Sequence, residues 1–266
     1  MAFLTEQERA LTAAFLRDGY VIAPADDRAS LDANRALIAG AAAAFLGTSY
    51  EDEETFLNTI AERIDGAQLN ALRLHVIDAI AADPDFRARY FACARSIVET
   101  LVGNELAMQR GVGLSVQLPG DDGSLLPLHS DAWSEDSPFE LVVWTPLVDC
   151  YRTKSMFLAG PQVDAAWRDR MSEFAHEGAE AFFRAIEPEV SWLEIPYGHV
   201  LVFTHTLMHG NRVNREPTAR WSLNVRFKGL FTPYSDKQLG DFFDPITLRA
   251  ATRIGMQYRL PAGFDE

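Results

Sequence analysis

The sequence has little cysteine, an excess of acidic over basic residues and no long apolar run. Its 266 residues include two cysteines, Cys93 and Cys150, which cannot build a disulfide framework and suit a reducing compartment such as the cytoplasm. No apolar run approaches the ~20 residues of a membrane helix, and residues 1–15 lack the order of a signal peptide. Lys and Arg number 24 against 38 Asp and Glu, a net charge of −14 that repels phosphate backbones. We therefore expect an acidic cytoplasmic protein with neither a membrane nor a nucleic acid as its partner.

Residues 1–104 predict a helical part of the chain. Thr5 with Glu8 three positions later forms a capping-box pattern, and Gly19 ends that first helix. A short strand over 20–23 follows. The other expected helices are an Ala-rich one from Ser30 to Gly47, one that begins at the acidic run 51–54, and two over 67–82 and 84–102.

From residue 105 the pattern changes to that of strands. In 220–228, Trp221 and its alternate neighbours through Phe227 form an apolar face, while Arg220 and its alternate neighbours through Arg226 form a polar one. Further strands are expected over 112–118, 139–148, 155–159, 190–195 and 199–204. Short strands between turns favour a sandwich or barrel, with the polar face of 220–228 toward its lumen.

The organisation predicted is one domain over 1–266 with a mainly β core at 105–232. A helical insertion at 164–187 interrupts the strands, and a helical extension occupies 233–266. In that extension Asp244 is the expected N-cap, because Pro245 suits the first position of a helix.

His129-Ser130-Asp131 is the first pattern that carries chemistry. On a strand, positions i and i+2 share a face, so an imidazole and a carboxylate converge. His209, 78 residues after Asp131, is a candidate third ligand. Two His and one carboxylate on one face of a metal form the facial triad of non-haem Fe(II) oxygenases.

Arg220 follows His209 by 11 residues, and Ser222 shares its face of the strand. A guanidinium binds a carboxylate with two parallel hydrogen bonds, and a hydroxyl adds a third. The pair therefore predicts a grip for a dicarboxylic acid inside the barrel.

These patterns resemble the Fe(II)/2-oxoglutarate-dependent dioxygenases, and among them the phytanoyl-CoA dioxygenase-like group. The segments that carry the likeness are TEQERALTAAFLRDGYVIA, LHSDAW, PYGHVLVFTHTLMHGNRVN and RWSLNVRF. A narrower likeness, to oxygenases of sporadic carbohydrate-biosynthesis clusters, rests on LSVQLPGD, HSDAWSEDSPFELVVWTPLVDC, KSMFL and FKGLFTPYSDKQLG. The likeness covers most of the chain.

The resemblance implies a double-stranded β-helix, or jelly roll, with flanking helices. It implies Fe(II) held by His129, Asp131 and His209, and 2-oxoglutarate anchored by Arg220 and Ser222 with a contact from Gln117. It implies hydroxylation of a small carbohydrate or sugar-linked metabolite. An acyl or amino-acid substrate, a non-catalytic metal-binding jelly roll and a zinc hydrolase are the alternatives.

Several residues keep two interpretations. His205, four residues before His209, suits a structural place better than a ligand role, because a strand precedes it and no Glu follows. Gln117 is a 2-oxoglutarate contact or a buried structural amide. Trp133 is a pocket wall or plain packing, and Lys154 either reaches the pocket or belongs to a turn. Asn224 and Arg226 are candidate substrate contacts, and the sequence leaves the oligomeric state open.

Overall fold

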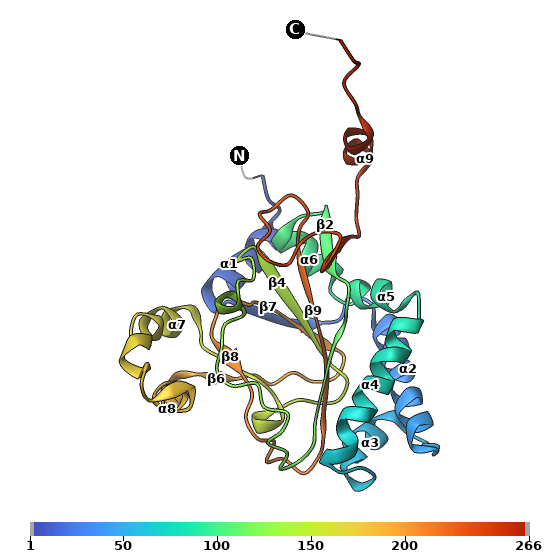
Figure 1. Cartoon of the computed structure of the whole chain (residues 1–266), viewed down its shortest axis with the longest axis vertical. Helices are drawn as coiled ribbons and strands as arrows, with labels where there is room; N and C mark the ends of the chain where they lie inside the picture. The colour runs from blue at the N-terminus through green and yellow to red at the C-terminus, as the bar shows by residue number, and fades with distance from the viewer. Residues whose placement is uncertain (1–2, 264–266) are drawn as a thin grey trace.

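A computed structural model describes residues 3–263 (Figure 1). Its α-helices are α1 (Glu6–Asp18), α2 (Arg28–Leu46), α3 (Glu53–Asn58), α4 (Gly66–Ala82), α5 (Phe86–Ala92), α6 (Arg95–Val102), α7 (Pro161–Arg168), α8 (Gly178–Ile186) and α9 (Ala250–Gln257). Its 3-10 helices are η1 (Ile60–Glu62), η2 (Asp131–Ser134), η3 (Arg152–Lys154), η4 (Met171–Phe174) and η5 (Glu187–Glu189). Within residues 3–263, no helix combines the length and the apolarity needed to cross a bilayer.

The strands form two antiparallel sheets. They are β1 (Tyr20–Pro24), β2 (Leu106–Gln109), β3 (Gly113–Gln117), β4 (Glu140–Pro146), β5 (Phe157–Leu158), β6 (Ser191–Trp192), β7 (His199–Thr204), β8 (His209–Gly210), β9 (Arg220–Gly229) and β10 (Phe243–Pro245). The large sheet has the order β1-β7-β4-β9-β2-β10, with β3 also paired to β9, and the small sheet has the order β6-β5-β8. The antiparallel core is as expected, but helices hold more residues than strands, so "mainly β" does not describe the chain as a whole.

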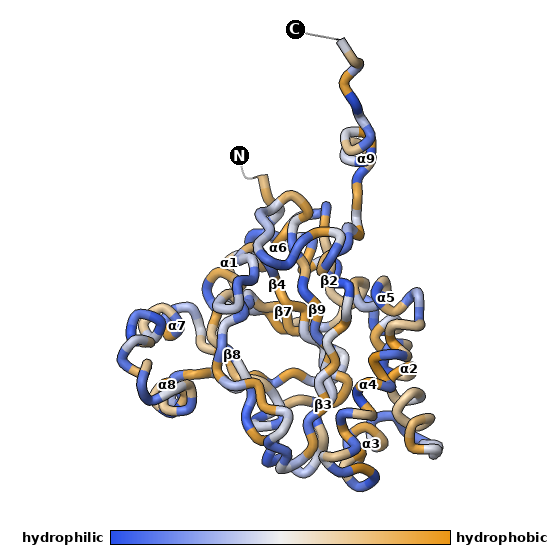
Figure 2. The backbone as a smooth tube through the Cα atoms, viewed as in Figure 1, coloured by the Kyte–Doolittle hydropathy of each residue, from blue (hydrophilic) through white to orange (hydrophobic). Residues whose placement is uncertain are grey.

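Strand β9 organises the large sheet, because it pairs with β4, β3 and β2. Its apolar face is fully buried: Trp221, Val225 and Phe227 have no exposed surface. The opposite face carries Arg220 and Arg226 toward the space between the sheets, so the lumen assignment made from alternation is confirmed. Figure 2 shows the hydrophobic residues concentrated along β4 and β7 beside β9.

The N-terminal helices cover one face of the large sheet (Figure 1). The capping box of Thr5 and Glu8 and the helix end at Gly19 are confirmed. The expected single helix over 84–102 is instead two, α5 and α6, because Asp26 binds the backbone at the junction. Its N–H donates to the Cys93 carbonyl and its carboxylate accepts from the Ser96 N–H.

The helical insertion between β5 and β6 contains two α-helices rather than one segment, and it begins at Pro161. Aromatic residues build a small core of its own, with Trp167, Phe182 and Phe183 buried. The insertion projects to one side of the sheets (Figure 1), and none of its described residues lines the cavity discussed below.

The expectation of a helix beginning at Asp244 and Pro245 is wrong, because these residues lie in β10 and pair with β2. The Asp244 carboxylate does not cap a helix. It accepts hydrogen bonds from Arg87 at 2.9 Å and Arg110 at 2.7 Å, so partners more than 130 residues away decide the local structure. The helix of the extension, α9, starts later at Ala250.

Candidate active site

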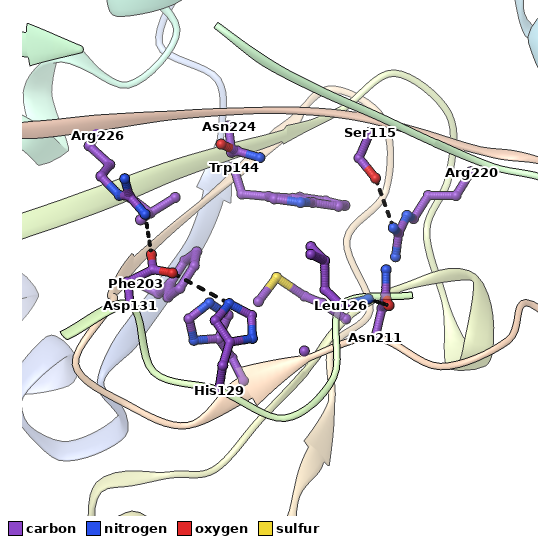
Figure 3. A pocket seen from close by; sticks show the side chains of 14 residues that line it. Ser115, Leu126, His129, Asp131, Trp144, Phe203, Asn211, Arg220, Asn224 and Arg226 are labelled. Atoms are coloured by element: carbon purple, nitrogen blue, oxygen red, sulfur yellow. Dashed lines mark hydrogen bonds and ion pairs between the residues drawn. The ribbon is translucent and has the colours of Figure 1, made fainter. Parts of the chain in front are cut away.

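A cavity of about 260 Å³ lies between the two sheets, and both contribute to its lining (Figure 3). The large sheet supplies residues of β3, β4, β7 and β9, and the small sheet supplies β8. The lining residues are Ser115, Leu126, His129, Asp131, Val142, Trp144, Met156, Phe203, His209, Gly210, Asn211, Arg220, Asn224 and Arg226. The sequence-predicted residues His129, Asp131, His209 and Arg220 therefore share one cavity.

A single antiparallel bridge brings His129 and His209 together. The His129 N–H donates to the His209 carbonyl at 3.0 Å, and the His209 N–H donates to the His129 carbonyl at 2.8 Å. The two imidazole rings consequently lie 4.4 Å apart, centre to centre. Gly210 follows in β8, where an added Cβ would meet the Leu126 carbonyl at 2.7 Å, so the close approach of the two segments requires glycine there.

Asp131 completes a group that can hold a metal ion. One ligand atom from each of His129, Asp131 and His209 lies within 4.8 Å of the other two. Each imidazole places Nδ1 against a backbone carbonyl, that of Pro127 for His129 and that of Leu207 for His209. Each Nδ1 donates its proton there, and each Nε2 keeps a lone pair for a metal. This donor set of two imidazoles and one carboxylate fits Fe(II).

The charge state of the group also suits metal binding. Burial, together with the adjacent His129, lowers the pKa of His209 to about 4, so this imidazole is neutral at pH 7. Burial acts to raise the pKa of Asp131, but the adjacent His129 and His209 rings and the charge and hydrogen bond of Arg226 hold it well below its usual range. The site thus offers an ionised carboxylate and a neutral imidazole, the forms that bind metals.

Behind Asp131 lies a partly buried ion-pair network, built around the buried Asp136, that the sequence did not disclose. The Nη2 atom of Arg226 lies 2.9 Å from Asp131 Oδ2 and 3.0 Å from Asp136 Oδ2, so it pairs with both carboxylates. Lys237 pairs with the other oxygen of Asp136. Asp131, Asp136 and His205 also form a possible metal-binding group. Since Arg226 and Lys237 already neutralise its two carboxylates, this second group has no need of a metal ion.

Arg226 holds one oxygen of Asp131, while the other, Oδ1, lies 3.4 Å from His129 Nε2. We expect Arg226→Gln to lower metal affinity by about 10- to 100-fold, the usual loss when a partner of a metal ligand is removed. Arg226→Lys, which keeps the charge, should lose less. Anaerobic titration of Fe(II) or Co(II) measures this. Unchanged metal affinity would instead make Arg226 a substrate contact.

Arg220 stands in the cavity wall with a positive charge that the described residues leave uncompensated. Its Nη2 donates to the Ser115 hydroxyl at 2.9 Å (Figure 3), and its Nη1 donates to the Ser155 carbonyl at 3.1 Å, so both partners are neutral. Its buried Nε has no partner among residues 3–263. Burial lowers the pKa of Arg220 to about 10, so the guanidinium stays charged at pH 7. An anion in the cavity would satisfy it.

Ser222 and Gln117 lie near Arg220 but do not line the cavity. Ser222 is fully buried, and its hydroxyl has no partner among the described residues. The Gln117 amide donates to the Arg212 carbonyl at 2.7 Å, which gives this side chain a structural bond. Ser115, two residues before Gln117 on the same face of β3, lines the cavity instead. The alternation of polar residues in 113–117 could have identified Ser115 as a candidate from the sequence.

The residues that the sequence left with two interpretations, Trp133, Lys154 and His205, do not line the cavity. Trp133 is 42% exposed. The expectation of a strand over residues 129–131 is wrong, because His129 forms only an isolated bridge and η2 begins at Asp131, so alternation does not extend to Trp133. Trp144 of β4 forms an aromatic wall in its place (Figure 3). Lys154 is buried outside the cavity, bonded to Asn58 and Thr218. His205 is buried and donates from Nε2 to the Ser137 carbonyl.

Glu140 begins β4 opposite Lys228, and its two carboxylate oxygens have no hydrogen-bond partner among the described residues. Burial and the nearby Asp136 raise its pKa to about 7, against the opposing charges of Arg226, Lys228 and Lys237. The folded protein therefore binds this proton more tightly than the unfolded chain. As pH rises from 4.5 toward 7, the unfolded chain ionises first, and stability falls.

We expect Glu140→Gln to remove this loss of folding stability, because glutamine has no proton to release. The variant should gain stability relative to the unchanged protein between pH 5 and pH 8, on the order of 1 kcal/mol after solvent screening. Thermal melting at both pH values, with exposed Glu62→Gln as the control for charge, measures the gain. An equal difference at both pH values would contradict the assignment.

No family model matches the sequence, and no curated protein is significantly similar to it. Solved structures are similar at the level of the fold. The non-haem monooxygenase ThoJ, in a nickel complex, aligns with TM-score 0.55 and 16% identity over 89% of this chain and 84% of its own. SnoK, a non-haem alpha-ketoglutarate-dependent carbocyclase of nogalamycin biosynthesis, aligns with TM-score 0.55 and 16% identity over 92% of this chain and 97% of its own. HygX from Streptomyces hygroscopicus, with nickel and 2-oxoglutarate bound, aligns with TM-score 0.53 and 14% identity over 89% of this chain and 90% of its own. The chain shares its fold with these proteins, and in that fold it carries a His/Asp/His group of the kind that binds a metal.

Proposed function

We propose that the protein is an Fe(II)- and 2-oxoglutarate-dependent oxygenase of the phytanoyl-CoA dioxygenase-like kind, and that it hydroxylates a small carbohydrate or sugar-linked metabolite. One observation carries the proposal: a two-His, one-carboxylate group and an uncompensated buried arginine line the same cavity. A zinc hydrolase would use the triad but gives Arg220 no task.

His129, Asp131 and His209 are the proposed ligands of Fe(II). Arg220, with Ser115 beside it, would bind the distal carboxylate of 2-oxoglutarate, because that carboxylate supplies the anion the guanidinium lacks. Ser222 is buried next to Arg220 and is the proposed source of a further hydrogen bond. The reaction converts 2-oxoglutarate, O2 and a C–H bond of the substrate into succinate, CO2 and a hydroxyl group. The iron supplies the oxygen chemistry, and the protein supplies orientation and a closed pocket.

The substrate end of the cavity combines an aromatic wall with hydrogen-bonding side chains. Trp144 offers a ring face, and Asn224 offers an amide beside it (Figure 3). Pockets for sugars pair apolar platforms with such groups, which supports the carbohydrate reading that the sequence resemblance suggested.

The test measures succinate release from 2-oxoglutarate by the iron-loaded protein, with and without O2. We expect O2-dependent succinate, accelerated by the true substrate. No conversion of 2-oxoglutarate under any condition would favour a non-catalytic metal-binding module. Hydrolysis that proceeds without O2 would favour the zinc hydrolase.

A panel of sugars, nucleotide-sugars, amino acids and acyl-CoAs identifies the substrate class. Stimulation by sugars or nucleotide-sugars supports the proposal. Stimulation by acyl-CoAs or amino acids alone contradicts the carbohydrate assignment and leaves the metal and 2-oxoglutarate assignments intact. Mass spectrometry of the product separates hydroxylation, which adds one oxygen, from other oxidative outcomes.

The proposal places this chemistry in one domain and in a reducing compartment. Cys93 and Cys150 are both buried and free, so neither forms a disulfide in the structure. That pattern is typical of cytoplasmic proteins.

A further inference from the structure

The C-terminal arm, residues 249–263, is the part of the chain with the least packing. Its helix α9 has eight residues, none of them buried, and the arm projects away from the sheets (Figure 1). Ile254, Met256, Tyr258 and Leu260 are each 62–77% exposed. Only the start of the arm is tied down, where the Arg249 N–H donates to Glu105 at 2.9 Å.

A helix this short is marginal in water without tertiary packing, and Gly255 weakens it further. The arm therefore needs a partner to cover its apolar side chains. Arg249 at its root already pairs with Glu99 of the same chain. Beyond it, residues 250–263 carry Arg253 and Arg259 and no acidic residue, in a chain whose net charge is −14. The chemistry that fits this arm is an apolar surface with acidic groups at its edge.

The chain itself carries such a surface, which we call the loop patch. It consists of the exposed side chains Trp133, Phe139, Phe231 and Leu239, together with the exposed acidic residues Glu135, Asp236 and Asp241. These residues lie on two loops, 131–139 and 230–242, which are bound to each other. The Ser137 hydroxyl donates to the Pro233 carbonyl at 2.6 Å, and Lys237 pairs with Asp136.

We infer that the protein is a homodimer in which the arm of each chain docks on the loop patch of the other. Loop 230–242 leads through β10 into the arm, so patch and arm root lie at the same end of the molecule, while the arm points away from its own patch (Figure 1). A twofold axis at that end allows both arms to cross at once, as an isologous interface requires. Each contact matches arginine with carboxylate and apolar with apolar.

Docking of the arm would also bear on the candidate site. Loop 131–139 carries Asp131 and Asp136, so a docked arm would cover the segment that positions the carboxylate of the proposed metal group. The dimer itself stands on the arm and the loop patch alone, and it does not depend on the proposed chemistry.

Sedimentation equilibrium of the full chain over a wide range of concentrations tests the inference. We expect twice the chain mass of 29.6 kDa. An arm variant, Ile254→Glu with Tyr258→Glu, and a patch variant, Phe231→Glu, should each be monomeric. Leu74→Glu, at an apolar position on α4 that is 55% exposed, is the matched control and should stay dimeric. Circular dichroism checks that every variant is folded.

Mixing the two monomeric variants is the decisive step. The arm variant keeps an intact loop patch, and the patch variant keeps an intact arm. The arm of the second can therefore dock on the patch of the first, and the mixture should form a heterodimer although each variant alone is monomeric. A monomeric unchanged protein would overturn the inference, as would docking of the arm on its own chain, which also leaves a monomer. Dimers that survive in both variants, or a mixture that stays monomeric, would overturn the arm-to-patch assignment.

Discussion

Replacing Asp131 with alanine is expected to abolish turnover and to reduce Fe(II) binding below detection, and the same holds for His129→Ala and His209→Ala. A facial site has only three protein ligands, so the loss of any one leaves too few to hold the metal at an ordinary iron concentration. For Asp131 the loss is compounded, because Arg226 would keep its positive charge beside the site without its carboxylate partner. Anaerobic metal titration and succinate release measure the two effects.

Two other histidines serve as controls for the triad. His75 is exposed on α4, and His75→Ala should change neither metal binding nor turnover. His205 lies 3.8 Å from Asp131 but bonds the Ser137 carbonyl through Nε2. An inactive His205→Ala beside a fully active His129→Ala or His209→Ala would reassign the ligand set.

Arg220→Lys is expected to weaken apparent 2-oxoglutarate affinity by about 2 kcal/mol, roughly 30-fold, with metal affinity little changed. Lysine keeps the positive charge but cannot present two parallel N–H groups to a carboxylate. It also lacks the rigid plane through which the guanidinium bonds Ser115 and Ser155 from two separate nitrogens. The concentration of 2-oxoglutarate that gives half-maximal succinate release measures the change.

The control for Arg220 is Arg212→Lys, since Arg212 lies outside the cavity and pairs with Glu180 on the insertion. This variant should keep its 2-oxoglutarate affinity. If Arg220→Lys lowers metal and 2-oxoglutarate affinity equally, the arginine is structural, because it contacts none of the proposed ligands.

The sequence predicted those parts of the fold whose cause is local. Alternation over 220–228 identified both faces of β9, since burial on one side and a lumen on the other impose a period of two. The capping box at Thr5 was predictable for the same reason, because its two hydrogen bonds join residues three apart.

Features that depend on distant partners could not be predicted. Asp244 has the local signature of an N-cap, yet Arg87 and Arg110 hold it in β10. A local pattern cannot show that Asp26 interrupts the helix after Ala92, since it acts from a turn 70 residues away from Ser96.

In the candidate site, too, local patterns were predictable and contacts with distant residues were not. The spacing of His129 and Asp131 and the family resemblance identified the residues that meet in the cavity, although the bridge that joins them is visible only in the structure. Arg226, a candidate substrate contact, lines the cavity and also pairs with Asp131. That pairing could not be predicted, because Asp136, on a loop with no strand periodicity, shares the same guanidinium nitrogen.

The bridge between His129 and His209 has a consequence for the motions of the apo protein. It consists of one residue pair with two backbone hydrogen bonds, and it joins segments 80 residues apart. In the described part of the chain only single hydrogen bonds flank it, from the Asn211 N–H to the Leu126 carbonyl and from the Asp131 N–H to the His205 carbonyl, in place of a regular ladder. A contact with so few backbone hydrogen bonds opens more readily than the strands of the large sheet. A ligand that both side chains share binds only the closed form, and it therefore slows opening by mass action. Amide hydrogen exchange at His129 and His209 should report this directly, with rapid exchange in the apo protein giving way to protection when the site is filled.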